Sequence, residues 1–208
     1  MPGKRPASGD PQVHVETRAA WRDWLVSHHD AGLGAAAAPT GVWAVTWRKP
    51  TGKPAPSYDD LVEEALCVGW VDSIARKLDD ERTMLRFSAR KPGSGWSRPN
   101  KLRVERLEAA GLMLAAGKAA VARAVADGTW TMLDAVEDLV VPDDLAAALE
   151  ARPPAAEEFD AFPRSVRRGI LEWIVQAKRP ATRERRVQET AERAQAGERA
   201  NQWRQPGG

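Results

Sequence analysis

Apolar and polar residues alternate in two stretches of the first half of the chain, at residues 42–48 and 83–90. Such alternation is typical of a strand that buries one of its two faces. In the second stretch Leu85 and Phe87 fall on one side, while the other side carries arginine and serine. A third, shorter strand is expected over residues 70–74. Together these segments predict a small antiparallel sheet.

Helical spacing of apolar residues dominates the rest of the chain. Residues 16–29 and 57–69 have apolar positions three and four residues apart, and Ser57 is placed to cap the second of these helices. After residue 99 every predicted element is a helix, and the clearest apolar stripe lies within 164–178. We therefore predict an α+β fold: a small antiparallel sheet of about three strands with six to eight helices, the C-terminal half being mainly helical.

The ends of the chain differ in composition from its middle. Residues 1–13 are rich in proline, glycine and charge and predict a disordered tail, and residues 198–208 predict a flexible one. The total of 208 residues suits one domain of ordinary size. We expect a single domain over 14–197, with a mixed α/β part over 14–100 and a helical part over 101–197.

Composition also narrows the class of protein. No apolar run approaches the roughly 20 residues that span a bilayer, and the first residues show no secretory signal. We therefore expect a soluble, cytoplasmic protein without membrane insertion. The single cysteine, Cys67, excludes an internal disulfide and a cysteine-based zinc site. His14, His28 and His29 lack the spacing of metal ligands, so no metal and no cofactor is expected.

The net charge of +2 hides an uneven distribution of charged residues. Residues 82–104 carry seven cations and no acid, and residues 164–186 carry eight cations against two acids. Between them, residues 131–160 carry nine acids against one arginine. If these segments lie on separate faces, the protein has a local positive field; if they lie together, the acids neutralise the cations. Both arrangements remain open at the level of sequence.

The segment 69–100 gathers the residues best suited to hold an anion. Arg90 and Lys91 leave a predicted strand through a loop, 92–97, that contains two glycines, two serines and Trp96. Backbone N–H groups in such a loop can turn inward and form an anion cradle, and an arginine binds phosphate or carboxylate through two parallel hydrogen bonds. The alternative is structural: Trp96 fills the core and the arginines pair with nearby acids.

Catalytic residues are not evident in this segment. Asp72 lies close in sequence to Arg76 and to the strand that ends at Arg90, and nearby positive charge makes a carboxylate a poor base near neutral pH. We interpret Asp72 as an anchor for Arg90. No nucleophile–base pair or cofactor fingerprint is present, so the sequence favours binding over catalysis.

Several of these motifs, with others later in the chain, follow one another in a recognisable order. They are 65–73 (ALCVGWVDS), 87–91 (FSARK), 94–97 (SGWS), Asn100, and the pairs 173–174, 177–178 and 182–183. This order resembles the YdeI/OmpD-associated family over about residues 42–197. Val68 stands where an aromatic residue is common in that family, and Ala89 stands where a proline usually precedes the Arg-Lys pair.

The resemblance implies a small cytoplasmic α+β protein linked to tolerance of bacteriocins, antimicrobial peptides and envelope stress. The ligand-binding residues that it and the loop chemistry predict are Trp70, Asp72, Ser73, Arg90, Lys91, Ser94, Trp96, Ser97 and Asn100. The predicted function is a stress-tolerance protein that binds a small anionic ligand in a pocket lined by tryptophan and arginine. The alternative is a nucleic-acid-binding protein that uses the basic segments 82–104 and 164–186. No oligomeric state is predicted, and Trp203 in the polar tail is a candidate contact for the domain or for a partner.

Overall fold

The chain forms two compact units in a computed structural model that describes residues 9–29 and 41–201. The N-terminal unit contains Met1–Ser94 and Pro99–Asp127, and the C-terminal unit contains Gly95–Arg98 and Gly128–Gly208. We expected one domain with an internal division near residue 100, so the observed division lies further along the chain. Most of the two expected tails, with Trp203, lies outside the described residues.

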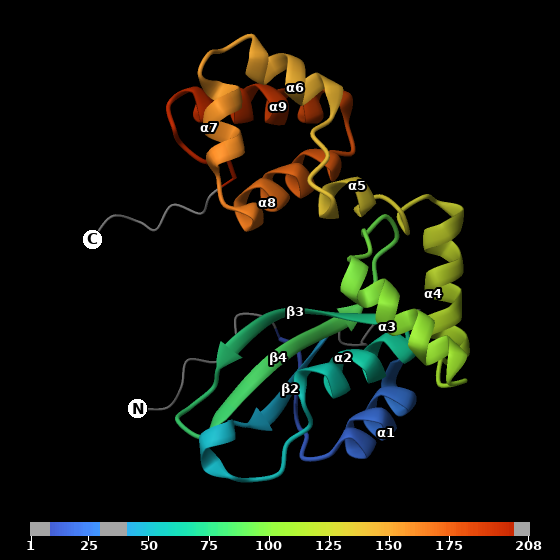
Figure 1. The fold of residues 1–208 in the computed structure, drawn as a ribbon. Helices are drawn as coiled ribbons and strands as arrows, with labels where there is room; N and C mark the ends of the chain where they lie inside the picture. Colours follow the sequence, from blue (N-terminus) through green and yellow to red (C-terminus); the bar gives the residue numbers. More distant parts are fainter. Residues whose placement is uncertain (1–8, 30–40, 202–208) are drawn as a thin grey trace. The chain divides into compact units, whose positions relative to one another are not determined.

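The described part of the N-terminal unit contains one mixed, four-stranded sheet (Figure 1). Its strands are β1 (Gln12–His14), β2 (Val42–Trp47), β3 (Trp70–Lys77) and β4 (Arg82–Ala89). Their order is β1-β2-β4-β3, with β1 parallel to β2 and the other neighbours antiparallel. The sequence predicts the last three strands. It misses β1 and so the parallel pair, because a strand of three residues is too short to show a periodic pattern.

Helices α1 (Arg18–His28) and α2 (Tyr58–Cys67) cover one face of this sheet (Figure 1). Trp21 of α1 is fully buried, and its ring lies 5.1 Å from that of Phe87 in β4. Its Nε1 also donates a hydrogen bond to the Leu61 carbonyl of α2 at 3.0 Å. One indole therefore holds both helices to the sheet.

The ends and neighbours of α2 are set by small local features. Ser57 caps the helix as predicted, because its side chain accepts from the Asp60 N–H while the Asp60 carboxylate accepts from the Ser57 N–H. The described residues of the unit also form the short 3₁₀ helix η2 (Lys49–Thr51) and the helices α3 (Arg98–Ala109) and α4 (Ala115–Ala126). A Cβ at Gly117 would lie 2.4 Å from the Cys67 carbonyl oxygen, so α4 packs this closely on the end of α2 only with glycine at that position.

The opposite face of the sheet buries a second, smaller apolar cluster. Trp43, Val45 and Met84 are buried there together, and Leu78 packs against them. Val42 and Ala44, which alternate with Trp43 and Val45 along the strand, are buried as well, so β2 buries both of its faces rather than the one that alternation predicts. Strand β3 continues to Lys77 rather than ending at residue 74. The sequence does not predict this extension, because residues 75–77 are all exposed and show no alternation of apolar and polar side chains.

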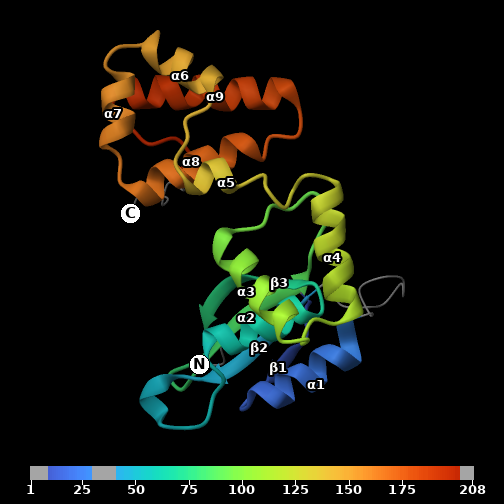
Figure 2. The same ribbon diagram turned by 45° about the vertical axis from the view of Figure 1, so that its right-hand side comes forward.

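The regular elements of the C-terminal unit are all helices in its described residues (Figure 2). Its helices are α5 (Asp134–Glu137), α6 (Asp143–Glu150), α7 (Ala155–Ala161), α8 (Arg164–Val175) and α9 (Pro180–Gln195). Helices α6, α7 and α8 each contact α9. The stripe predicted within 164–178 is confirmed, since Ile170, Leu171 and Ile174 are buried in the core of this unit.

The predicted fold class is confirmed. The described residues form a sheet in the first half and mainly helices in the second, which is an α+β fold. No helix in the described ranges is long and apolar enough to cross a membrane.

Candidate functional site

The residues predicted to bind a ligand fall in both units. Trp96 and Ser97 belong to the C-terminal unit, and the others, Arg90 among them, belong to the N-terminal unit. The pocket that Arg90 and Trp96 are predicted to share therefore stays a prediction. The surroundings of each residue can be described within its own unit.

The two tryptophans predicted as pocket walls are buried. Trp70 and Trp96 are each 2% exposed. Trp70 meets Trp24 edge to face at 6.3 Å, and Trp24 stacks on Trp21 at 5.5 Å. Trp96 packs at a tilt against Trp130 at 5.0 Å. Both indoles thus fill side-chain cores and present almost no surface to a ligand, as in the structural alternative that the sequence leaves open.

Asp72 is held by a tyrosine as well as by positive charge. Its Oδ2 accepts a hydrogen bond from the Tyr58 hydroxyl at 2.8 Å. Burial and this bond to Asp72 raise the pKa of Tyr58 to about 12. Burial lowers the pKa of Arg90 to about 10, and the charge of Asp72 opposes that shift. The role of Asp72 as an anchor for Arg90 stays a prediction.

Other predicted polar residues bond to their own neighbourhood. The Ser73 hydroxyl donates to a carbonyl of β4 at 3.4 Å, and the Ser94 hydroxyl donates to the Lys91 carbonyl at 2.7 Å. The buried Asn100 accepts from Arg103 through its Oδ1 at 3.1 Å. These bonds shape the strand and the loop, and they engage the hydroxyls that an anion would need.

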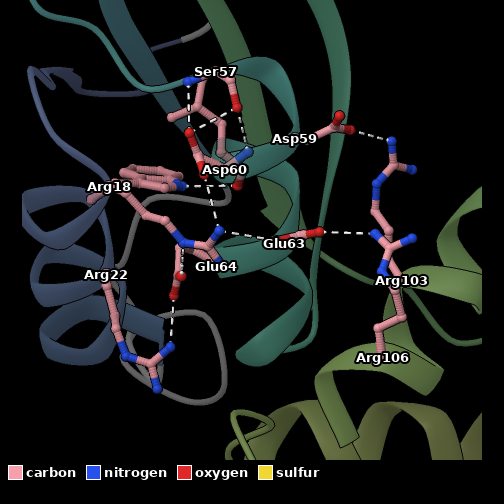
Figure 3. A network of polar contacts seen from close by, with 11 residues as sticks. Arg18, Arg22, Ser57, Asp59, Asp60, Glu63, Glu64, Arg103 and Arg106 are labelled. Carbon is pink, nitrogen blue, oxygen red and sulfur yellow. Dashed lines mark hydrogen bonds and ion pairs between the residues drawn. The ribbon is translucent and has the colours of Figure 1, made fainter. Parts of the chain in front are cut away.

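A polar network joins α1, α2 and α3 (Figure 3). Glu64 of α2 is 3% exposed and binds two arginines of α1, Arg18 at 2.6 Å and Arg22 at 2.7 Å. On another side of α2, Glu63 binds Arg106 of α3 at 3.0 Å. A buried carboxylate with two arginine partners satisfies both oxygens, so this network holds the helices together.

The acidic and basic segments of the C-terminal unit neutralise each other. Arg168 of α8 binds Glu137 at 2.9 Å, and Arg183 of α9 binds Asp144 at 2.7 Å. The hydrogen bonds from these arginines lower the pKa values of both carboxyl groups. The sequence left open whether acids and cations neutralise each other, and in these pairs they do. The pairing reduces the positive field of residues 164–186.

A cavity of about 750 Å³ opens in the N-terminal unit where β2 ends. It is bordered by the end of β2, the start of β4, Ala75 of β3, the loop 48–57 and the start of α2. Its apolar lining includes Leu61, Met84 and Leu85. This volume falls within the range of about 300–1,000 Å³ that small-molecule sites occupy.

The charged residues that line this cavity are all cations: Arg48, Lys49 and Lys53. Arg48 donates from Nη1 to a main-chain carbonyl of the β3–β4 turn at 2.9 Å. Lys53 lies 3.2 Å from the Glu81 carboxylate and 3.9 Å above the Trp47 ring. Lys49 is exposed. The loop therefore places positive charge at the edge of an apolar hollow.

None of the residues predicted to bind a ligand lines this cavity, and the nearest link is the hydrogen bond from Tyr58 to Asp72. The sequence predicts only a connecting loop over 50–56, because three prolines and a glycine disfavour a strand or an α-helix there. The structure corrects this at the start of the loop, where Lys49–Thr51 form one turn of 3₁₀ helix, η2, with Pro50 in its first turn. The sequence feature that could have located the cavity is the group of three cations, Arg48, Lys49 and Lys53, beside or within this loop. Loops on a rigid scaffold commonly carry function.

Comparison with known families divides the chain in two. A family model described as a domain of unknown function, DUF8412, matches residues 13–120, which is more than half of the chain. The chain belongs to the DUF8412 family. A second model, described as bacteriocin-protection, YdeI or OmpD-associated (OmdA), matches residues 138–197. No curated protein and no solved structure is significantly similar to the chain.

These matches confirm part of the predicted resemblance. The OmdA match supports a YdeI/OmpD-associated-like protein, and it covers α6 to α9 with the late motif pairs of the sequence. The earlier motifs, 65–73 and 87–91, lie instead in the DUF8412 part, which also contains the whole lining of the cavity. The resemblance expected over 42–197 is thus shown for its C-terminal portion.

Proposed function

We propose that this protein binds a small anionic ligand in the cavity of its N-terminal unit. The supporting observation is that Arg48, Lys49 and Lys53 are the charged residues of the cavity lining and that all three are cations. Apolar walls strengthen the attraction between such cations and an anion, because less water screens the charges.

The proposed role is stress tolerance in the bacterial cytoplasm, linked to protection against bacteriocins or antimicrobial peptides. The description of the OmdA family, which matches residues 138–197, supports this link. Ligand binding is assigned to the DUF8412 part, whose cavity lining lies within residues 13–120. The proposal includes no catalytic step and no cofactor.

The site of binding is proposed at the cavity rather than at the segment 70–100. Two observations favour the cavity: Trp70 and Trp96 are buried, and the Ser73 and Ser94 hydroxyls donate to main-chain carbonyls. The cavity, in contrast, is open and has the exposed Lys49 at its edge.

Isothermal titration of the full chain with a panel of nucleotides, phospho-sugars and carboxylates tests this proposal. Lys49→Glu reverses a charge at the cavity and is expected to weaken binding at least about tenfold. Lys118→Glu is the matched control, because Lys118 is an exposed lysine of α4 in the same unit and does not line the cavity. If no anion of the panel binds the unmodified chain more tightly than millimolar, the proposal is wrong.

Nucleic-acid binding by segments 82–104 and 164–186 is the second candidate. It is favoured by Lys178 and Arg179, which are exposed side by side before α9. It is weakened by the ion pairs of Arg168 and Arg183. A gel shift at low salt tests it: binding that falls steeply with added salt supports it, and free probe at high protein concentration excludes it.

A further inference from the structure

Three of the four hydroxyl-bearing side chains that line the cavity, all except Thr46, donate to protein acceptors. The Thr83 hydroxyl donates to the Arg76 carbonyl at 3.0 Å, and the Tyr58 hydroxyl donates to Asp72 at 2.8 Å. The Ser57 hydroxyl donates to the Asp60 carboxylate at 2.7 Å and accepts from the Asp60 N–H. A sugar or ribose that entered the cavity would bury hydroxyls with few groups to bond, which is costly.

The rest of the lining suits a hydrocarbon body. Leu85 of β4, Ala75 of β3 and Trp47 present accessible apolar surface to the cavity, whereas Leu61 and Met84 line it from buried positions. Transfer of one methylene group from water to an apolar environment is favourable by about 0.8 kcal/mol of free energy. A ligand with an alkyl or aryl body is therefore stabilised most by this surface.

The positive charge is confined to one side of the cavity lining and is limited in amount. All three cations lie within residues 48–53, at one end of the loop. Lys53 is already paired with Glu81, and the Arg48 guanidinium is oriented by a main-chain carbonyl. This arrangement suits a head group of single negative charge better than a di- or triphosphate, which requires several unpaired donors.

We infer that the ligand is an amphipathic monoanion, an alkyl or aryl carboxylate, with its head group at residues 48–53 and its apolar body against Leu85 and Ala75. This inference rests on the proposed function, because it names the chemical class of the ligand for the same cavity. It distinguishes carboxylates with a hydrocarbon body from nucleotides and phospho-sugars, which carry many hydroxyls.

A chain-length series of alkanoates provides the test. Titration calorimetry with butyrate, hexanoate, octanoate and decanoate, each below its micelle concentration, is expected to show affinity rising about threefold to fourfold per added methylene. Octanamide, which has the same body without the charge, is expected to bind at least about tenfold more weakly than octanoate. AMP and glucose 6-phosphate are expected to bind more weakly than octanoate.

A substitution that fills the cavity locates the binding. Ala75→Trp places an indole at an exposed position of β3 that lines the cavity, so it is expected to abolish octanoate binding without unfolding the unit. Ile74→Trp is the matched control, because Ile74 is the exposed neighbour in the same strand and does not line the cavity. Circular dichroism of both variants checks that they fold.

The outcomes separate this inference from the proposed function. If AMP or glucose 6-phosphate binds and Ala75→Trp removes that binding, while alkanoates do not bind, the ligand class is wrong and the proposed function stands. If octanoate binds equally to the chain and to a folded Ala75→Trp variant, the inference is overturned because the carboxylate occupies another site. If no anion binds at all, both are wrong.

Discussion

The two units bury their apolar residues in different ways. In the N-terminal unit a sheet carries helices on one face, and the loop 48–57 crosses from β2 to α2 beside a cavity of about 750 Å³. In the C-terminal unit helices pack on one another, and a hollow of about 100 Å³ lies near Val136 and Ile174. The larger hollow thus lies beside the strand-to-helix loop of the N-terminal unit, and the smaller one lies among the helices of the C-terminal unit.

The two units also differ in how their charged side chains are arranged. The acids of the C-terminal unit come from one segment and pair with the arginines of the next, as Glu137 does with Arg168. In the N-terminal unit the acids of α2 pair with α1 and α3, while the cavity keeps cations alone in its lining. Both units thus pair most of these charges, but the cavity of the N-terminal unit is lined by cations, of which Lys53 is paired with Glu81 outside the lining.

The largest expected effect is at the close contact between α2 and α4. Gly117→Val places a side chain against the Cys67 carbonyl, so it is expected to destabilise the N-terminal unit by about 3 kcal/mol or more. Gly169→Ala is the comparison in α8, where nothing lies within 4 Å of an added Cβ, and it is expected to stabilise the C-terminal unit by about 0.5–1 kcal/mol. Urea denaturation measures both. Equal stability of the Gly117→Val variant and the unmodified chain would contradict the close packing.

A smaller loss is expected from the buried carboxylate of α2. Glu64→Gln removes the charge that binds Arg18 and Arg22, and it is expected to cost about 1–3 kcal/mol, since both arginines remain partly exposed. Glu105→Gln, at an exposed position of α3, is the control and is expected to change stability by less than about 0.5 kcal/mol. Thermal unfolding followed by circular dichroism measures both. Similar effects of the two variants would show that the network does not stabilise the unit.

Acid is expected to weaken the C-terminal unit through Glu137. Its pKa is lowered from the ordinary 4.5 by the hydrogen bond from Arg168, so the folded state binds its proton less readily than the unfolded state. The stabilisation is present above pH 4.5 and is lost as the pH falls through the lowered value. Arg168→Met is expected to remove about 1 kcal/mol of stability at neutral pH and to reduce the loss on acidification.

The control for this pH dependence is Arg185→Met, because Arg185 is exposed and its pair with Glu189 is long, at 3.5 Å. Stability curves measured by urea denaturation between pH 6 and pH 3 compare the variants. If Arg168→Met and Arg185→Met give the same pH profile, the assignment to Glu137 is wrong.

The smallest effect is expected at the hollow of the C-terminal unit. Val140 lines this hollow and is 55% exposed, so Val140→Thr is expected to change stability by less than about 0.5 kcal/mol. The same variant is expected to leave octanoate binding unchanged, in contrast to Lys49→Glu. Reduced octanoate binding by Val140→Thr would contradict the assignment of the ligand to the open unit.

The candidate site shows where inference from the sequence ends. Trp96 and Arg90 are unusual residues in one short segment, and a local pattern cannot tell a residue that lines a pocket from one that fills a core. The cavity lining combines residues from β2, β4, the loop and α2, such as Thr46, Lys53, Leu61 and Leu85. Their proximity depends on the pairing of strands that lie far apart in the chain, and no local spacing encodes it.

Local chemistry by itself determined most of the helix and strand segments of this protein, the short β1 and the end of β3 being exceptions. The Ser57 cap, the stripe with Ile170 and Ile174, and the alternation in β2 and β4 each follow from neighbouring residues, because hydrogen bonding and side-chain direction repeat over a few positions. Only the tertiary structure decided that the chain divides into two units, that the late arginines meet the acids before them, and that the loop cations border a cavity. These features arise from contacts between distant segments, where packing and charge select one arrangement among several that the same local patterns allow.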